Sequence, residues 1–193
     1  MAMRVPECAF ESTTKGTHMG HDIADALQRV VSVLERRPEA GLHDDAPASV
    51  RWDGGTRFIA RHPNGAEVPT DMPRELGGGG GEVTPGWLFR AGLASCAATC
   101  IAMLAAREGV ALRALDVHAA SRSDTRGILG LHDSDGGTVP ATPQDLQLQV
   151  RIAADGIAPA QLRDLAERAC RQSPVPCAVQ TALPLDLRIA LGG

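Results

Sequence analysis

The sequence predicts an α+β domain in which antiparallel β-hairpins surround one apolar helix. Three observations favour this class. Residues 146–153, LQLQVRIA, alternate apolar and polar side chains as a half-buried strand does. Asn64-Gly65 stands between two β-prone segments and is typical of a hairpin turn. Residues 87–106 carry one charged side chain, Arg90, which is typical of a helix enclosed by its neighbours.

The chain ahead of this domain divides into two parts. Residues 1–20 carry no periodic pattern and are expected to form a disordered leader. From His21 an amphipathic helix is predicted, which Pro38 and Gly41 end, and residues 21–47 hold this helix and a linker to the domain at 48–193. Its apolar residues recur at helical spacing: Ile23, Leu27, Val30, Val31 and Leu34.

The first half of the domain begins with strands expected at about 48–53, 56–62 and 66–70. Five consecutive glycines at 77–81 predict a flexible loop, since they offer no side chain to bury. A phosphate-binding loop would need a Gly-Lys-Ser/Thr ending, which is missing. Thr84 and Pro85 then have the pattern of the N-cap and first turn of a helix that reaches about Glu108, before Gly109.

The second half continues with a strand at 112–122, a polar loop to Pro143 and the alternating strand at 146–153. A helix opened by Pro159 places Leu162, Leu165, Ala166 and Ala169 on one face. Ser173 before Pro174 has the pattern of an N-cap, so capping a short helix is its expected role. A last strand is predicted with these side chains inward: Leu183, Leu185, Leu187 and Ile189.

Composition limits the partners of the 193-residue chain. A net charge of −4 and only 3% aromatic residues argue against a nucleic acid as partner. The single apolar segment is rich in alanine and glycine, so a buried helix is favoured over a membrane span. The five cysteines fit neither a secreted disulfide framework nor a metal-binding pattern, and no signal peptide is recognised, so a reducing cytoplasm is expected.

Cys96 and Cys100, on the apolar helix, have two interpretations: inert packing or a reactive thiol. Cys96 lies about three turns into the helix, too far for the helix dipole to activate it, so an arginine would have to supply positive charge. A disulfide between the two is not expected, because their Cβ vectors run parallel, and Cys100 is interpreted as packing. Asp133 and Asp135 resemble the start of a calcium loop without its remainder, and a turn is expected there.

Three segments resemble the OsmC/Ohr family, the osmotically inducible and organic hydroperoxide resistance proteins. Residues 73–96, PRELGGGGGEVTPGWLFRAGLASC, resemble its glycine loop, Thr-Pro helix start and run into a reactive cysteine. Residues 105–112, AAREGVAL, match its helix exit, and residues 169–179, ACRQSPVPCAV, resemble its second cysteine motif. The resemblance covers roughly residues 48–190.

The resemblance implies an OsmC-like fold, in which an antiparallel sheet packs around a long central helix within an intertwined homodimer. In that family the first cysteine, here Cys96, attacks a hydroperoxide and becomes a sulfenic acid. A second cysteine then forms a disulfide with it. An external dithiol, for which a lipoyl protein is one candidate, reduces the disulfide, and no bound cofactor is implied.

The chain departs from the family pattern at three positions. Ser173 stands where the second cysteine is expected, which leaves Cys177, one helical turn further, as the candidate partner. Gly86 replaces a glutamate. The family arginine is displaced by one residue to Arg57, with Arg51 and Arg61 as rivals, and such an offset turns a strand side chain to the other face. The candidate catalytic residues are therefore Cys96, Cys177 and Arg57.

The leading hypothesis is a thiol-dependent peroxidase acting on organic hydroperoxides or hydrogen peroxide. The alternative is a non-catalytic protein that binds a hydrophobic small molecule in the dimer pocket, since fold does not settle function. A cysteine hydrolase is a third option that needs a histidine beside Cys96. An arginine within hydrogen-bond reach of the Cys96 sulfur is the observation that best separates them.

Overall fold

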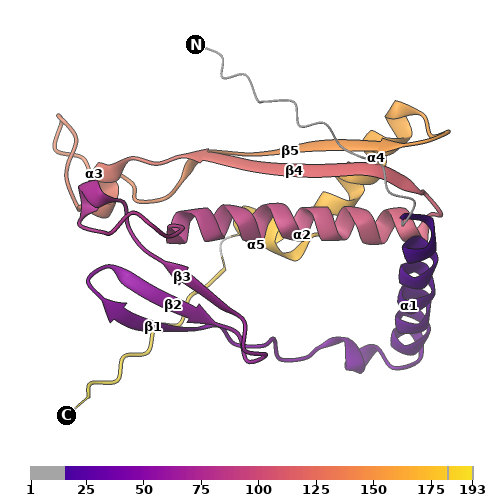
Figure 1. Cartoon of the computed structure of the whole chain (residues 1–193), viewed down its shortest axis with the longest axis horizontal. Coiled ribbons are helices and arrows are strands. Elements are labelled where there is room, and N and C mark those ends of the chain that lie inside the picture. Colours follow the sequence, from indigo (N-terminus) through magenta and orange to yellow (C-terminus); the bar gives the residue numbers. More distant parts are fainter. Residues whose placement is uncertain (1–15, 182, 193) are drawn as a thin grey trace.

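Two antiparallel sheets lie on either side of a long helix, α2 (Pro85–Arg107), as Figure 1 shows. This computed structural model describes residues 16–181 and 183–192. One sheet contains β1 (Ser49–Gly54), β2 (Arg57–Arg61) and β3 (Glu67–Thr70), and the other pairs β4 (Leu112–Arg122) with β5 (Gln144–Ala154). The predicted α+β class with antiparallel pairing is confirmed.

The three-stranded sheet is a meander whose turns follow from the sequence. β2 and β3 pair with Phe58 opposite Thr70, and the connection at Asn64-Gly65 has Gly65 at φ 93°. A positive φ is a conformation that glycine adopts without steric cost. The predicted hairpin is confirmed.

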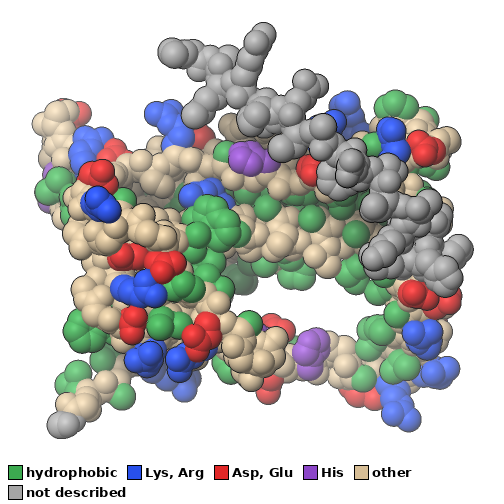
Figure 2. Space-filling model, viewed as in Figure 1, with side chains coloured by type: hydrophobic (Ala, Val, Ile, Leu, Met, Phe, Trp, Pro, Cys, Tyr) green, Lys and Arg blue, Asp and Glu red, His purple; other side chains and the backbone are tan. Residues whose placement is uncertain are grey.

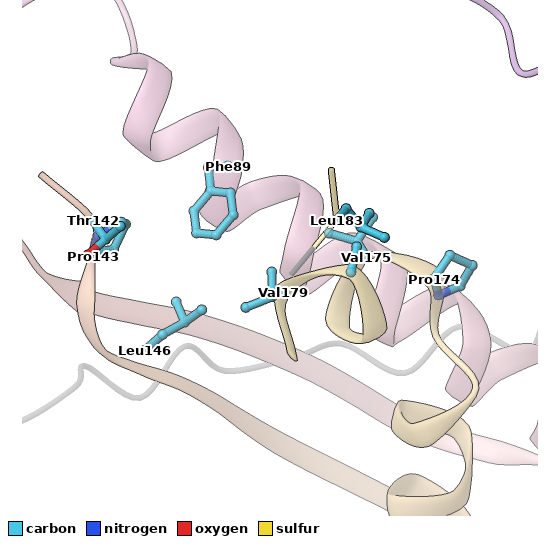
Figure 3. A pocket seen from close by; sticks show the side chains of 9 residues that line it. Phe89, Thr142, Pro143, Leu146, Pro174, Val175, Val179 and Leu183 are labelled. Carbon is cyan, nitrogen blue, oxygen red and sulfur yellow. The ribbon is translucent and has the colours of Figure 1, made fainter. Parts of the chain in front are cut away.

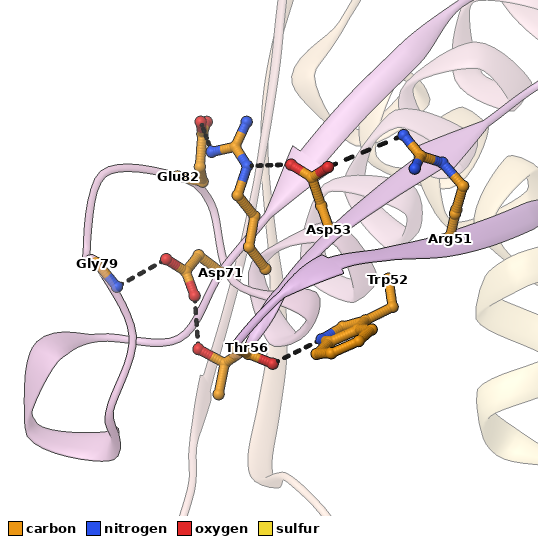
Figure 4. Close-up of polar contacts among 9 residues, drawn as sticks. Arg51, Trp52, Asp53, Thr56, Asp71, Gly79 and Glu82 are labelled. Carbon is orange, nitrogen blue, oxygen red and sulfur yellow. Dashed lines mark hydrogen bonds and ion pairs between the residues drawn. The ribbon is translucent and has the colours of Figure 1, made fainter.

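The five-glycine segment is a loop, but it is held in place by hydrogen bonds. After the short 3₁₀ helix η2 (Arg74–Leu76), the chain returns to Asp71 at the end of β3 (Figure 4). The Gly79 amide donates to Asp71 Oδ2 at 2.7 Å, and the Thr56 hydroxyl donates to Asp71 Oδ1 at 2.6 Å. A Cβ on Gly78 would lie 1.8 Å from the Met72 carbonyl oxygen, so glycine is required for this close approach.

We expect Asp71→Asn to lower the melting temperature at neutral pH, because an amide cannot accept all the hydrogen bonds that the carboxylate accepts. The Thr56 hydroxyl, and then the Gly79 and Met72 amides, hold the pKa of Asp71 below its ordinary value. A carboxyl with a lowered folded-state pKa stabilises the fold above its unfolded pKa, about 3.9, and loses that contribution as pH falls through the folded value.

Thermal unfolding from pH 7 to pH 2 checks this prediction. The difference in melting temperature between wild type and Asp71→Asn should narrow as the pH drops below about 4. Glu75→Gln is the matched control, since Glu75 lies on η2 beside the loop and is exposed. Equal melting temperatures for wild type and Asp71→Asn at pH 7 would show that Asp71 does not anchor the loop.

Helix α2 begins and ends as the sequence predicts. Thr84 is its N-cap and accepts from the Trp87 amide at 3.2 Å, and Gly109 beyond its C-terminus has φ 67°. One stripe of the helix is buried, formed by Leu93, Ala97, Ile101 and Ala105. The opposite side is open, with Trp87 47% exposed and Met103 38% exposed. Burial on every side is therefore not reached within one chain.

By length and composition alone α2 would also be able to cross a membrane, and no other helix of the described chain meets that test. Its buried stripe, however, packs like that of a core helix. Ile101 and Ala105 form one buried cluster with Leu165, Ala166 and Ala169 of α4 (Pro159–Arg171), and β4 and β5 contribute side chains to its edge. The predicted inward face of α4 is confirmed, since Leu162 is buried as well.

The N-terminal helix α1 (Gly16–Arg36) stands across the C-terminal end of α2 (Figure 1). It begins five residues before the predicted start, so residues 16–20 belong to it and not to a leader, while residues 1–15 lie outside the described residues. The linker, with a 3₁₀ turn η1 (Pro38–Gly41), runs back to β1 fully exposed. An open gap separates this linker from α2 in the space-filling view (Figure 2).

Two other segments test the sequence predictions. In the loop after the short helix α3 (Thr125–Ile128), the Asp133 carboxylate accepts from the Asp135 and Gly137 amides, so the expected turn is confirmed. The predicted last strand is wrong for one chain. Residues 183–192 pair with no sheet, and their apolar side chains are 65–92% exposed: Leu183, Leu185, Leu187, Ile189 and Leu191. The alternating apolar pattern predicts a strand, but within one chain residues 183–192 have no sheet or helix to pack against.

Candidate functional site

Cys96 lies where α2 meets the start of α5 (Pro174–Gln180), and its sulfur accepts two hydrogen bonds. The Ser173 hydroxyl donates to Cys96 Sγ at 3.1 Å, and the Val175 amide donates to it at 3.4 Å. Ser173 is fully buried. It occupies the N-cap position of α5 without capping it through its side chain, so the predicted capping role is wrong. The hydroxyl is oriented toward the sulfur instead.

Two donors are directed at the Cys96 sulfur. The same donors could bind the oxygen that this sulfur would carry after oxidation. The position of Ser173 beside Cys96 explains why the serine is buried with its hydroxyl satisfied. Ser173 stands at the position of the family's second cysteine, which indicates that it should lie close to Cys96. The Ser-Pro pattern indicates helix capping instead, and that local pattern decided the prediction.

The predicted arginine does not reach this sulfur within one chain. Arg57 donates to Glu82 Oε1 at 2.6 Å and to Asp53 Oδ2 at 3.0 Å, and Glu82 first and then Asp53 raise its pKa. Glu82 precedes α2, while Cys96 lies eleven residues into that helix, about 16 Å along its axis. The Arg57–Glu82 ion pair therefore lies near the N-terminus of α2, whereas the Cys96 thiol lies about three turns further along this helix.

The rival arginines belong to the same sheet. Arg51 lies 3.9 Å from Asp53, and Arg61 lies 2.6 Å from Glu67. Figure 4 shows Arg51, Asp53 and Glu82 on the strand side of the glycine loop. Among the described residues, no arginine and no histidine hydrogen-bonds to Cys96, so the hydrolase option gains no support.

The other cysteines are distributed around the site. Cys177, on α5, donates its thiol to the Arg171 carbonyl oxygen at 3.2 Å and makes no hydrogen bond to Cys96. Cys100 and Cys170 pack against the core cluster of α2 and α4. All four are free thiols, and Cys8 lies outside the described residues. In residues 16–181 and 183–192, no group of three or more metal-ligating side chains is placed to hold an ion.

An apolar cavity of about 720 Å³ lies against α5, and Cys96 is not itself among the residues that line it. Figure 3 shows Phe89 from α2, Leu146 from β5 and Val179 from α5 around the same space. Val175 lines it too, and its amide is the one that donates to Cys96. No lining side chain is ionisable. Its walls come from segments up to about ninety positions apart, so no local sequence pattern predicted the cavity.

Comparison with known proteins agrees with this arrangement. The family model described as OsmC-like protein matches residues 78–188, more than half of the chain. The match includes the glycine loop, α2 with Cys96, and α5. No curated protein sequence matches the chain significantly.

Solved structures share the fold at low sequence identity. An OsmC-like protein from Mycoplasma pneumoniae has a TM-score of 0.59 at 12% identity, covering 73% of this chain and 91% of that one. Organic hydroperoxide resistance proteins from Legionella pneumophila and Elizabethkingia anophelis each have a TM-score of 0.53, at 21% and 20% identity. They cover 72% and 73% of this chain and 91% of their own. The chain belongs to the OsmC-like protein family.

Proposed function

We propose that the chain is a thiol-dependent peroxidase that reduces organic hydroperoxides or hydrogen peroxide through Cys96. The observation that carries the proposal is the Cys96 sulfur, which accepts hydrogen bonds from Ser173 and Val175. Val175 also lines an apolar cavity. The thiolate attacks the terminal peroxide oxygen, the O–O bond breaks, and the leaving oxygen takes a proton to become an alcohol or water. Cys96 becomes a sulfenic acid.

The cavity favours apolar substrates. Its nine lining residues present carbon surface around Phe89 and Leu146 and no charge, so an alkyl or aryl group gains free energy by leaving water there. Hydrogen peroxide gains none of this. The names of the two hydroperoxide resistance proteins with the same fold agree with this substrate class.

We propose that a second copy of the chain supplies the positively charged side chain that Cys96 lacks within its own chain. Arg57 is far from the Cys96 of its own chain, and its guanidinium is 40% exposed beside Glu82. In a homodimer, the first sheet of one chain approaches the open side of α2 in the other, and Arg57 completes the partner's site. Glu82 takes the place of the glutamate that Gly86 lacks, since it pairs with this arginine.

Turnover requires the sulfenic acid to be reduced, and we propose Cys177 as the second thiol. α5 is a short helix of seven residues, and a small shift of it would release the Cys177 thiol from the Arg171 carbonyl. Cys177 then attacks the Cys96 sulfur, water leaves, and an external dithiol reduces the disulfide. The reducing cytoplasm in which we place the chain supplies such dithiols.

Peptide mapping after one equivalent of hydroperoxide tests the second thiol. We expect a crosslink between Cys96 and Cys177, found in wild type and absent from Cys177→Ser. Cys100→Ser is the matched control and should leave the crosslink intact. A sulfenic acid trapped on Cys96 with Cys177 still alkylatable would instead show a single-thiol cycle, in which an external thiol reduces Cys96 directly.

The function itself is tested by consumption of cumene hydroperoxide and of hydrogen peroxide with dithiothreitol or a dihydrolipoyl protein as reductant. We expect turnover, faster with cumene hydroperoxide. The second candidate function is non-catalytic binding of a hydrophobic molecule. The apolar cavity favours it, as does the finding that no arginine of the described residues hydrogen-bonds to Cys96. This second function predicts ligand binding in the cavity and no consumption of either peroxide with any dithiol.

A further inference from the structure

A second pair of cysteines, Cys100 and Cys170, lies in the core next to the Cys96 site. Cys100 is on α2 and Cys170 is on α4. Both are partly buried, and both pack against the same cluster of buried side chains: Ile101, Ala105, Leu165, Ala166 and Ala169. The proposed peroxidase reaction uses neither thiol, so their common placement calls for a separate explanation.

The packing of the helices brings the two cysteines to the same level. Ser173, just after α4, contacts Cys96, and Arg168 donates to both carboxylate oxygens of Glu108 at the far end of α2, at 2.6 and 2.9 Å. α4 therefore runs antiparallel to α2, as Figure 1 also shows. Cys100 lies four residues after Cys96 and Cys170 three residues before Ser173, each about one helical turn in the same spatial direction.

The local side chains allow the sulfurs to approach. Alanines line the contact on both helices at Ala105, Ala166 and Ala169, and small residues let helix axes come close together. A disulfide needs Cα atoms within about 7 Å and Cβ atoms that face each other. Cysteines on two helices that pack against one cluster are able to meet the second condition, which two cysteines four apart on one helix do not.

The acidity of Cys170 agrees with this placement. Burial raises the pKa of the Cys170 thiol, and the neighbouring Cys100 raises it further through charge repulsion. At neutral pH Cys170 is therefore protonated, which makes it a poor attacking group toward a peroxide. An attack by Cys170 on a mixed disulfide therefore depends on its proximity to Cys100 and not on its acidity.

We propose that Cys100 and Cys170 form a second dithiol, which a low-molecular-weight disulfide oxidises to an interhelical disulfide bond. The Cys100 thiol gives up its proton as its sulfur attacks the small disulfide and forms a mixed disulfide; the first small thiol leaves with the electron pair of the broken S–S bond and takes up a proton. Cys170 gives up its proton and attacks the Cys100 sulfur, and the second small thiol leaves with the electron pair and takes a proton. Two protein thiols are oxidised, and one small disulfide is reduced to two thiols.

The consequence of this bond concerns the peroxide site. The disulfide would tie α4 to α2 one turn from Cys96, at the end of α4 that leads into Ser173, and so keep the Ser173 hydroxyl on the Cys96 sulfur. Only this consequence rests on the proposed peroxidase function. Formation of the bond does not, because Cys96 takes no part in it.

The test uses the full-length Cys96→Ser protein, folded and treated with glutathione disulfide. Trypsin places Cys100 in peptide 91–107, Cys170 in 169–171 and Cys177 in 172–188, so Cys96→Ser leaves one cysteine in each. Under non-reducing conditions we expect peptide 91–107 linked to 169–171 within one chain. We also expect one more glutathione thiol released per chain than from a variant that lacks Cys170 as well, and a higher melting temperature than that of the reduced protein.

The double variant Cys96→Ser, Cys170→Ser is the matched control. It should carry one glutathione on Cys100, form no crosslink and show no rise in melting temperature on oxidation. Separate glutathione adducts on Cys100 and Cys170 in Cys96→Ser, both thiols unmodified, or Cys170 linked to peptide 172–188 would each overturn the proposal. Formation of this bond in Cys96→Ser, together with a wild-type protein that consumes no hydroperoxide, would contradict the peroxidase function alone.

Discussion

Replacement of Cys96 by serine is expected to reduce hydroperoxide consumption to the uncatalysed rate while the protein stays folded. A serine hydroxyl is far less acidic than a thiol and does not react with peroxides, so the nucleophile is lost. Serine is close to cysteine in volume, and the Ser173 hydroxyl and Val175 amide can donate to its oxygen as they do to sulfur. The cost in stability should stay below about 1.5 kcal/mol.

Steady-state peroxide consumption with a dithiol, together with the melting temperature, measures both parts of this prediction. Cys100→Ser is the matched control, because Cys100 lies one turn along the same helix and packs against the core without contacting Ser173. It should retain turnover. Turnover in Cys96→Ser equal to that of wild type would assign the reaction to another thiol and remove the basis of the proposed mechanism.

Parts of the fold could be predicted where residues close in the sequence decide where a helix, strand or turn begins and ends. Thr84 and Pro85 begin α2 as the N-cap and first turn, and Asn64-Gly65 turns β2 into β3. The prediction of the apolar face of α4 is confirmed, because the helical spacing of Leu162, Leu165 and Ala166 is set by residues within about one turn of each other. Each of these predictions needed only residues close in the sequence.

The site depends on contacts that no spacing rule contains. Ser173 has the pattern of a cap, yet its hydroxyl donates to a sulfur 77 positions earlier in the chain. Glu82 pairs with Arg57 across 25 positions, so the arginine that the sequence favoured is engaged away from Cys96. Five consecutive glycines predict a flexible loop, but a hydrogen bond from Gly79 to Asp71 holds it in place. The sequence does not show this bond, because the fold brings the two segments together.

The chain leaves apolar surface uncovered in three places, all of which the proposed homodimer would cover. The outer side of α2 exposes Trp87 and Met103, and the tail exposes alternating leucines. β1 exposes Trp52 at 64% along one edge of its sheet. A soluble chain seldom leaves apolar patches of this extent open to water, and obligate dimers cover them with interfaces above roughly 2,000 Å². The gap between the linker and α2 in Figure 2 leaves room for a partner segment.

We therefore expect the protein to sediment at twice the 20.2 kDa of one chain, with no dissociation on dilution to about 1 μM. The tail is the segment whose role is easiest to isolate. Its leucines alternate with polar residues, so Leu185→Asp with Leu187→Asp places two charges on the face that a partner's sheet edge or α2 would cover. This double variant should dissociate or unfold.

The matched control changes the other face of the same segment. Asp186 and Arg188 form an exposed ion pair between those leucines, so Asp186→Asn with Arg188→Gln should leave the dimer intact, because exposed pairs contribute little. Sedimentation and the melting temperature are measured for both variants. A wild-type protein that is a folded monomer at micromolar concentration would contradict the dimer. It would also leave Arg57 without a route to Cys96, since in one chain α2 separates the two by about three turns.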